Sequence, residues 1–208
     1  MLDNLFGPDL IYRIPALLIA ITFHEYAHAL TAFKMGDPTP KYSGRLTINP
    51  LAHLDPIGLL MLWLFKFGWA KPVPVNPYHF RDPKKGMFYV AFAGPLSNII
   101  LAFITMLILK MNFVRWVAIY IILRLLLSYN LILAVFNLIP LPPLDGSKIL
   151  MAILPGRQAQ KFSSIEPYGP IILIALLYLG LLDGILWTLI TFLNNMLNML
   201  TNFLINII

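Results

Sequence analysis

Long apolar stretches separated by short polar segments set the pattern of this chain. Three of them, residues 11–33, 87–109 and 116–139, are long enough to cross a bilayer as helices, which takes about 20 mostly apolar residues. A fourth stretch, residues 57–70, is shorter than that, and a last one, residues 168–208, has room for two helices. The pattern therefore predicts an all-α membrane protein with about five or six transmembrane helices.

The short stretch 57–70 is predicted to be a re-entrant or β-like segment rather than a span. Its flanks, residues 44–56 and 68–77, are rich in proline and glycine, which break helices and suit extended chain. Loops rich in Lys and Arg collect on the cytoplasmic side of a membrane. A re-entrant segment keeps both neighbouring basic clusters on that side, whereas a spanning segment would separate them. The clusters are Lys34, Lys41 and Arg45 before the stretch, and Lys71, Arg81, Lys84 and Lys85 after it.

Composition supports the membrane assignment and limits the chemistry. The chain has 208 residues, of which 59% are hydrophobic and 12% charged, whereas soluble domains are about 25% charged. Cysteine is absent, so a transition metal would have to be held by His, Asp or Glu. The net charge of +6 is distributed over short loops, and no basic tract interleaves with aromatic residues. We therefore expect a single membrane domain over residues 1–208 and no nucleic-acid partner.

Residues 24–28 read His-Glu-Tyr-Ala-His and lie inside the first apolar stretch. Positions four apart share one face of a helix, so His24 and His28 can bind the same metal ion. Zinc lowers the pKa of a bound water molecule to about 7, and Glu25 can take its proton. Ionisable groups at membrane depth are costly and usually functional. The motif predicts zinc-dependent peptide hydrolysis, and a polar cluster that only joins helices is the alternative.

A catalytic zinc ion usually takes three protein ligands, and Asp145 is the preferred third ligand. Three prolines precede it at the end of the apolar stretch 116–139 and leave backbone groups that need partners from protein or water. His53 is left open between a contact with the ligands or substrate and a structural role. The other candidates are Asp183, expected on the opposite side of the membrane, Glu166 and His79 in polar loops, and Asp55 beside His53.

Topology gives an independent argument for this ligand set. The two histidines lie towards the C-terminal end of the first apolar stretch, and Asp145 lies just after the stretch 116–139. They can meet only if an even number of spans separates them. With 57–70 not spanning, the stretches 87–109 and 116–139 make two crossings. The site then falls on the cytoplasmic side, which the charge distribution also favours, with Lys110 and Arg115 as exceptions on the far side.

Three motifs follow one another over most of the chain: residues 24–28, the segment Ala93-Gly-Pro-Leu-Ser-Asn98, and residues 137–146. With them the sequence resembles the site-2 proteases, the intramembrane zinc metalloproteases of peptidase family M50, in their compact bacterial and archaeal form without a PDZ or CBS domain. The resemblance implies a catalytic core over about residues 11–150, followed by C-terminal helices over 168–208.

The resemblance also assigns roles within the site. It implies one zinc ion per chain, held by His24, His28 and Asp145, with Glu25 as general base. Asn137 is expected near the catalytic centre, where it stabilises the oxyanion or holds the substrate backbone. The re-entrant segment is expected to present an extended edge to which an unwound substrate helix adds as a strand. Gly94 and Asn98 would let their helix pack closely against the site, with direct catalytic roles left open.

We therefore expect an intramembrane zinc metalloendopeptidase that hydrolyses peptide bonds in or near transmembrane segments of membrane-protein substrates. Its partners would be the lipid bilayer and a transmembrane or membrane-anchored protein substrate, with a homo-oligomer left open. Its place would be a prokaryotic plasma membrane. The main alternative is a catalytically silent membrane binding or chaperone-like protein. A zinc protease with a glutamate ligand is disfavoured because Glu166 lacks a helical motif, and a transporter because no inverted repeat is found.

Overall fold

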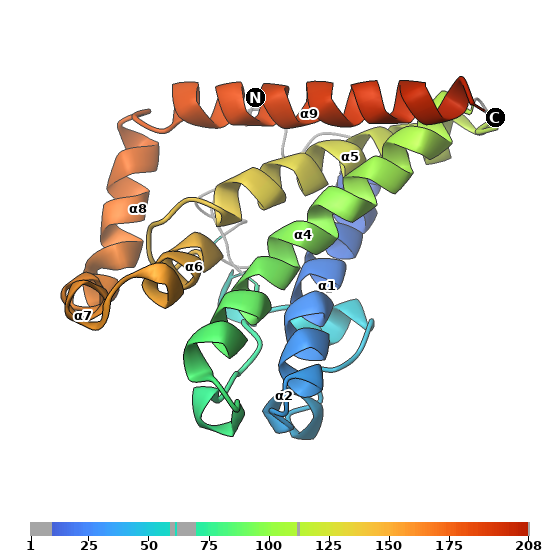
Figure 1. Cartoon of the computed structure of the whole chain (residues 1–208). Coiled ribbons are helices and arrows are strands. Elements are labelled where there is room, and N and C mark those ends of the chain that lie inside the picture. Colours follow the sequence, from blue (N-terminus) through green and yellow to red (C-terminus); the bar gives the residue numbers. More distant parts are fainter. Residues whose placement is uncertain (1–9, 59–60, 62–69, 112, 208) are drawn as a thin grey trace.

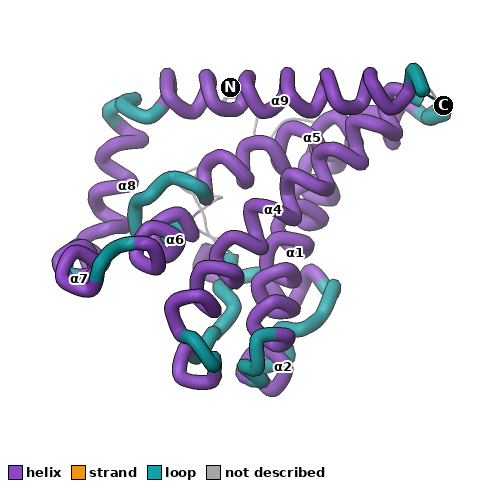
Figure 2. Tube along the Cα trace, viewed as in Figure 1, coloured by secondary structure: helices purple, strands orange, loops and turns teal. Residues whose placement is uncertain are grey.

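The computed structural model describes residues 10–58, 61, 70–111 and 113–207, and within them the chain is helical (Figure 2). β pairing in these residues is limited to one isolated antiparallel bridge between Leu54 and Ala70. The all-α prediction is therefore confirmed. The α-helices are α1 (Leu10–Lys34), α2 (Thr39–Tyr42), α4 (Pro83–Lys110), α5 (Val117–Asn137), α6 (Asp145–Ile153), α7 (Gly156–Ser163), α8 (Gly169–Tyr178) and α9 (Asp183–Ile205), and the 3₁₀ turns are η1 (Pro50–His53), η2 (Pro77–His79) and η3 (Glu166–Tyr168).

The three long apolar stretches form α1, α4 and α5, with ends within a few residues of those expected. α4 begins before its apolar run because Asp82 caps it. The Asp82 side chain accepts a hydrogen bond from the Lys85 N–H at 3.1 Å, and Pro83 occupies the first turn. The chain turns away from α1 at Gly36, whose φ of 106° is a left-handed conformation that glycine adopts without strain.

α1, α4 and α5 form the central bundle, and α9 lies across one end of it (Figure 1). Small residues let these helices approach one another. Ala16 and Ala20 of α1 pack against Leu126 of α5. A second apolar cluster joins α4, α5 and α9 through Ala102, Ala134 and Leu197 and their neighbours. α2 and the first turns of α4 lie at the end of the bundle opposite α9, and α6 lies beside the middle of the bundle (Figure 1).

The expected five or six membrane spans are not confirmed. In the described residues, α1, α4 and α5 are long and apolar enough to cross a membrane. A fourth span exists only if the α7–α8 unit and α9, bent by 87°, count as one broken span. α8 has only 10 residues, about 15 Å of helix. Most of the stretch 57–70, and with it the re-entrant prediction, lies outside the described residues.

Candidate metal centre

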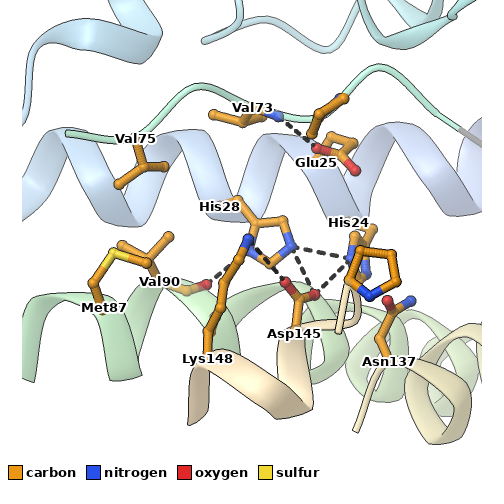
Figure 3. A pocket seen from close by; sticks show the side chains of 13 residues that line it. His24, Glu25, His28, Val73, Val75, Met87, Val90, Asn137, Asp145 and Lys148 are labelled. Carbon is orange, nitrogen blue, oxygen red and sulfur yellow. Dashed lines mark hydrogen bonds and ion pairs between the residues drawn. The ribbon is translucent and has the colours of Figure 1, made fainter. Parts of the chain in front are cut away.

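The side chains of His24, His28 and Asp145 converge on one point, although they come from helices far apart in the sequence (Figure 3). The Nε2 atoms of His24 and His28 lie 3.2 Å and 3.1 Å from the Oδ2 atom of Asp145, and 3.0 Å from each other. All three residues are buried. The histidines share one face of α1, and Asp145 is the first residue of α6.

The chemistry of this triangle fits a cation. The second ring nitrogen of each histidine is already engaged: His24 Nδ1 lies 2.6 Å from Asn98 Oδ1, and His28 Nδ1 lies 2.7 Å from the Val90 carbonyl oxygen. Because these oxygens accept, both Nδ1 atoms donate, and both Nε2 atoms direct lone pairs at the carboxylate. Three acceptors this close repel one another unless a cation lies among them. Their separations of 3.0–3.2 Å are close to the edge of a tetrahedral zinc site, about 3.3 Å.

Two glycines allow the site to assemble. A Cβ atom at Gly94 of α4 would overlap the imidazole rings of His24 and His28, so only glycine lets α4 approach α1 at this level. A Cβ atom at Gly146 would overlap backbone carbonyl groups just after α5, so α6 could not begin where it does. The close packing expected at Gly94 is confirmed by this geometry.

Glu25 lies on α1 beside the first histidine and faces an extended segment, residues 70–76, that runs along this helix (Figure 3). Its Oε2 atom accepts a hydrogen bond from the backbone N–H of Val73 at 3.2 Å. Unlike the buried ligands, Glu25 is half-buried and lines the pocket at the site. A carboxylate that lines the same pocket as the ligand triangle is the candidate general base of the site.

Arg45 holds the extended segment in place. Its guanidinium donates hydrogen bonds to the backbone carbonyl oxygens of Ala52, Lys71 and Pro72, the last at 3.2 Å. Arg45 is buried, and this burial lowers the pKa of its guanidinium against the opposing influence of the Glu25 carboxylate. The sequence counted Arg45 only as a loop charge, whereas the structure gives it this structural role.

Asp37 anchors the other end of the extended segment. It is fully buried just after α1 and accepts hydrogen bonds from the Asn76 N–H at 2.7 Å, His79 Nδ1 at 2.7 Å and the Thr39 N–H at 3.0 Å. Burial alone would raise the pKa of Asp37, but these bonds, that of His79 foremost, hold the pKa below its ordinary value. Because both ends are fixed, the Val73 N–H is held against α1.

The ligand triangle opens into a pocket of about 320 Å³. Val73 and Val75 of the extended segment line one side of the pocket, and Asn137 and Lys148 line the side next to Asp145 (Figure 3). Asn137 therefore lies near the ligands, as expected. Lys148 Nζ lies 4.0 Å from Asp145 Oδ1, and its side chain is 41% exposed.

The remaining candidates from the sequence lie elsewhere in the described part of the chain. His53 is fully buried, and its Nε2 donates to a backbone carbonyl of its own loop at 2.8 Å, so it is structural. Asp55 caps the turn that follows it by accepting from two backbone N–H groups. His79 donates a hydrogen bond to the buried carboxylate of Asp37. Glu166 in η3 and Asp183 in α9 are exposed.

Sequence reasoning missed four contributors to the site: the Val73 N–H, the Val90 carbonyl, Asn130 and Lys148. Backbone groups carry no side-chain signal, so nothing in the residue pattern marks the first two. Lys148 could have been found, because it follows Asp145 by three positions in one helix and such residues share a face. Asn130, whose Oδ1 accepts from Asn98 Nδ2 at 2.7 Å, could have been noticed as an amide inside a mostly apolar run, where polar groups usually bond to another helix.

The fold and the site together define a helical protein with membrane-length helices and a buried His-His-Asp group that could hold a metal ion. The sequence model of Peptidase family M50 matches residues 114–179. The Bacillus subtilis protein named "Putative zinc metalloprotease YwhC" is 38% identical over 190 residues, which cover 85% of this chain and 84% of that protein. No solved structure matches the chain closely enough for comparison. The chain therefore belongs to peptidase family M50.

More distant relatives agree with this assignment. The Mycobacterium tuberculosis protein named "Putative zinc metalloprotease Rip2" is 27% identical over 182 residues, which cover 82% of this chain and 68% of that protein. "Zinc metalloprotease MJ0392" of Methanocaldococcus jannaschii is 32% identical over 138 residues, which cover 66% of this chain and 33% of that protein.

Proposed function

We propose that this chain is an intramembrane zinc metalloprotease of the site-2 protease type, which hydrolyses peptide bonds in or near transmembrane segments of membrane-protein substrates. The convergence of His24, His28 and Asp145 beside Glu25, in a bundle of three membrane-length helices, carries the proposal. Membership of family M50 supports it, as do the names of relatives described as zinc metalloproteases.

His24 and His28 would hold zinc through Nε2 and Asp145 through a carboxylate oxygen. Zinc bound there supplies a Lewis acid that acidifies water and polarises a peptide carbonyl. Both histidines are in the tautomer that binds a metal through Nε2, because each Nδ1 donates its proton to an oxygen and each Nε2 keeps its lone pair. Burial of all three ligands keeps bulk water from competing with substrate at the site.

Glu25 takes a proton from the attacking water molecule as the oxygen of that water forms a bond to the peptide carbonyl carbon. It returns a proton to the leaving nitrogen as the carbon–nitrogen bond breaks, so the carboxylate ends the cycle unprotonated. The Val73 N–H aims the carboxylate and leaves its second oxygen for this transfer. Asn137 and Lys148 line the pocket beside the ligands, and each carries N–H groups that can stabilise a carbonyl oxygen that gains negative charge.

A substrate must be extended to fit this site, because a peptide bond inside a helix is protected by the helix's own hydrogen bonds. Val73 and Val75 offer a straight backbone along the pocket, against which an extended peptide can lie as an added strand. The site is built on membrane-length helices, which favours substrates whose cleavage region is itself membrane-embedded.

Metal analysis of the detergent-purified protein, followed by assay on reconstituted single-span membrane proteins, tests the proposal. We expect about one zinc ion per chain in the wild type, retention of zinc but loss of cleavage in Glu25→Gln, and loss of zinc in Asp145→Ala. Wild-type protein purified without chelators that carries no zinc would contradict the ligand assignment. Cleavage that persists in Glu25→Gln would contradict the general-base role.

A further inference from the structure

Three buried polar side chains from three helices form a chain of hydrogen bonds that ends at the metal centre. Asn130 of α5 donates from Nδ2 to the Leu126 carbonyl oxygen at 2.7 Å. Asn98 of α4 donates from Nδ2 to Asn130 Oδ1 at 2.7 Å and to the Ala20 carbonyl oxygen at 3.1 Å. His24 of α1 completes the chain, with Nδ1 2.6 Å from Asn98 Oδ1. Asn98 and Asn130 are fully buried.

The direction of each carboxamide follows from neighbours that can only accept. The Leu126 carbonyl accepts, so Asn130 turns Nδ2 towards it and Oδ1 towards Asn98. Asn98 therefore meets two acceptors, Asn130 Oδ1 and the Ala20 carbonyl, and presents Nδ2 to both. Only the Asn98 oxygen remains for His24, so Nδ1 of that histidine must carry the ring proton.

We propose that Asn130 is a positioning residue of the metal centre: acting through Asn98, it fixes His24 in the Nδ1–H tautomer and keeps Nε2 unprotonated for zinc. This inference rests on the zinc site of the proposed function. Without the Asn130 oxygen, only the Ala20 carbonyl opposes rotation of the Asn98 carboxamide. If that carboxamide turns, its Nδ2 faces His24 Nδ1, the ring proton moves to Nε2, and the lone pair needed for the metal is lost.

His28 provides an internal comparison. Its Nδ1 donates to the Val90 backbone carbonyl at 2.7 Å, and a main-chain carbonyl inside a helix cannot turn over as a side-chain amide can. The tautomer of His28 is therefore fixed by the backbone of α4 alone. The tautomer of His24 depends on the Asn98 side chain instead. Because that side chain can rotate, a second asparagine, Asn130, is needed to hold it.

A double-mutant cycle on zinc affinity tests the proposal, with affinities measured by competition with a chromophoric chelator. The proteins are wild type, Asn130→Leu, Asn98→Asp and the double variant. Aspartate at position 98 has no N–H to turn towards His24, so it accepts from Nδ1 whatever residue occupies position 130. We expect Asn130→Leu to weaken zinc binding about tenfold when position 98 is asparagine and by less than about twofold when it is aspartate.

The cycle separates positioning from packing. If Asn130 only fills space, Asn130→Leu costs the same factor in both backgrounds, and that result overturns the proposal. An unchanged zinc affinity in Asn130→Leu overturns it as well. Failure of the wild type to bind zinc would instead contradict the proposed function, and the tautomer can then still be measured directly.

The ¹⁵N spectrum of the metal-free protein gives that direct measurement. The two ring nitrogens of His24, assigned by their loss in His24→Asn, report which one is protonated. We expect the Nδ1–H form in the wild type and a mixture with the Nε2–H form in Asn130→Leu. An Nε2–H form in the wild type, or an identical spectrum in the variant, overturns the proposal. Thermal unfolding in detergent confirms that each variant is folded.

Discussion

Glu25 and Val73 are 48 positions apart, yet the carboxylate of the first accepts a hydrogen bond from the backbone N–H of the second at 3.2 Å. Val73 lies between Pro72 and Pro74, which have no N–H, so it is the only main-chain donor in this part of the extended segment. The general base assigned to this site is therefore oriented by one main-chain group, and that group can be removed by a single substitution.

Val73→Pro removes this N–H while keeping an extended backbone, to which proline and its neighbours are already suited. We expect kcat/KM to fall about tenfold, as for loss of a hydrogen bond to a charged group, with zinc content unchanged because no ligand is touched. Val73→Ala keeps the N–H and serves as the matched control, so its activity should stay near that of the wild type. Equal activities in the two variants would contradict the role given to this bond.

Gly94→Ala places a methyl group against both histidine rings. Either α4 moves away from α1 or the rings rotate, and both responses displace Nε2 from the ligand triangle. We expect zinc affinity to drop by at least about tenfold and stability to fall by about 1–3 kcal/mol, as for other overpacked cores. Gly156→Ala is the control, because a Cβ atom there meets no other atom within 4 Å. Normal zinc binding in Gly94→Ala would contradict the claim that only glycine lets α4 approach α1 at this position.

Asp37 should give the protein an acid-sensitive contribution to stability. Its folded-state pKa lies below the ordinary value of 3.8, so the contribution is complete above pH 3.8 and is lost as pH falls through the folded pKa. The melting temperature of Asp37→Asn should therefore lie below that of the wild type at pH 6, and the gap should close on acidification. His79→Ala removes the strongest donor and should move the loss to higher pH. A gap independent of pH would contradict this account.

Lys148 places a positive charge near the ligands, 4.0 Å from an oxygen of Asp145. This charge repels a divalent cation, although solvent screens it because the side chain is partly exposed. We expect Lys148→Met to bind zinc about threefold more tightly while kcat falls, since the pocket loses a donor for the reacting carbonyl oxygen. Lys161→Met, an exposed change on α7, controls for the loss of one charge. Weaker zinc binding in Lys148→Met would contradict the repulsion.

The sequence could predict that these three side chains meet, because helical periodicity relates the two histidines and topology brings the aspartate to them. His24 and His28 differ by four positions within an apolar run, which puts them on one face, and counting the crossings brought Asp145 to the same end of the bundle. The structure places these three side chains within 3.2 Å of one another. The close approach at Gly94 was expected from the family resemblance, and a Cβ atom there would overlap both imidazole rings.

The sequence could not predict how the extended segment docks. Neither helical nor strand periodicity marks residues 70–76, and their position is decided by Arg45 and Asp37, which bind mainly backbone groups. The expected span count is not confirmed for a related reason. Hydropathy registers the apolar content of residues 168–208 but does not register the 87° bend before α9, which depends on how α9 packs against α4 and α5.

Arg45 donates its hydrogen bonds to main-chain oxygens rather than to side chains. The position of the extended segment is therefore set separately from the side chains that the segment presents to the pocket. The course of residues 70–76 does not rest on the side chain of Val73, which lines the pocket. Val75 also lines the pocket, but its side chain packs against the apolar cluster of Ala32, Phe80 and Val90. Substitution at Val73 can therefore alter which peptides fit without disturbing the three converging side chains. This position is a natural starting point for redirecting the enzyme to chosen sequences, and a small set of variants would suffice to explore it.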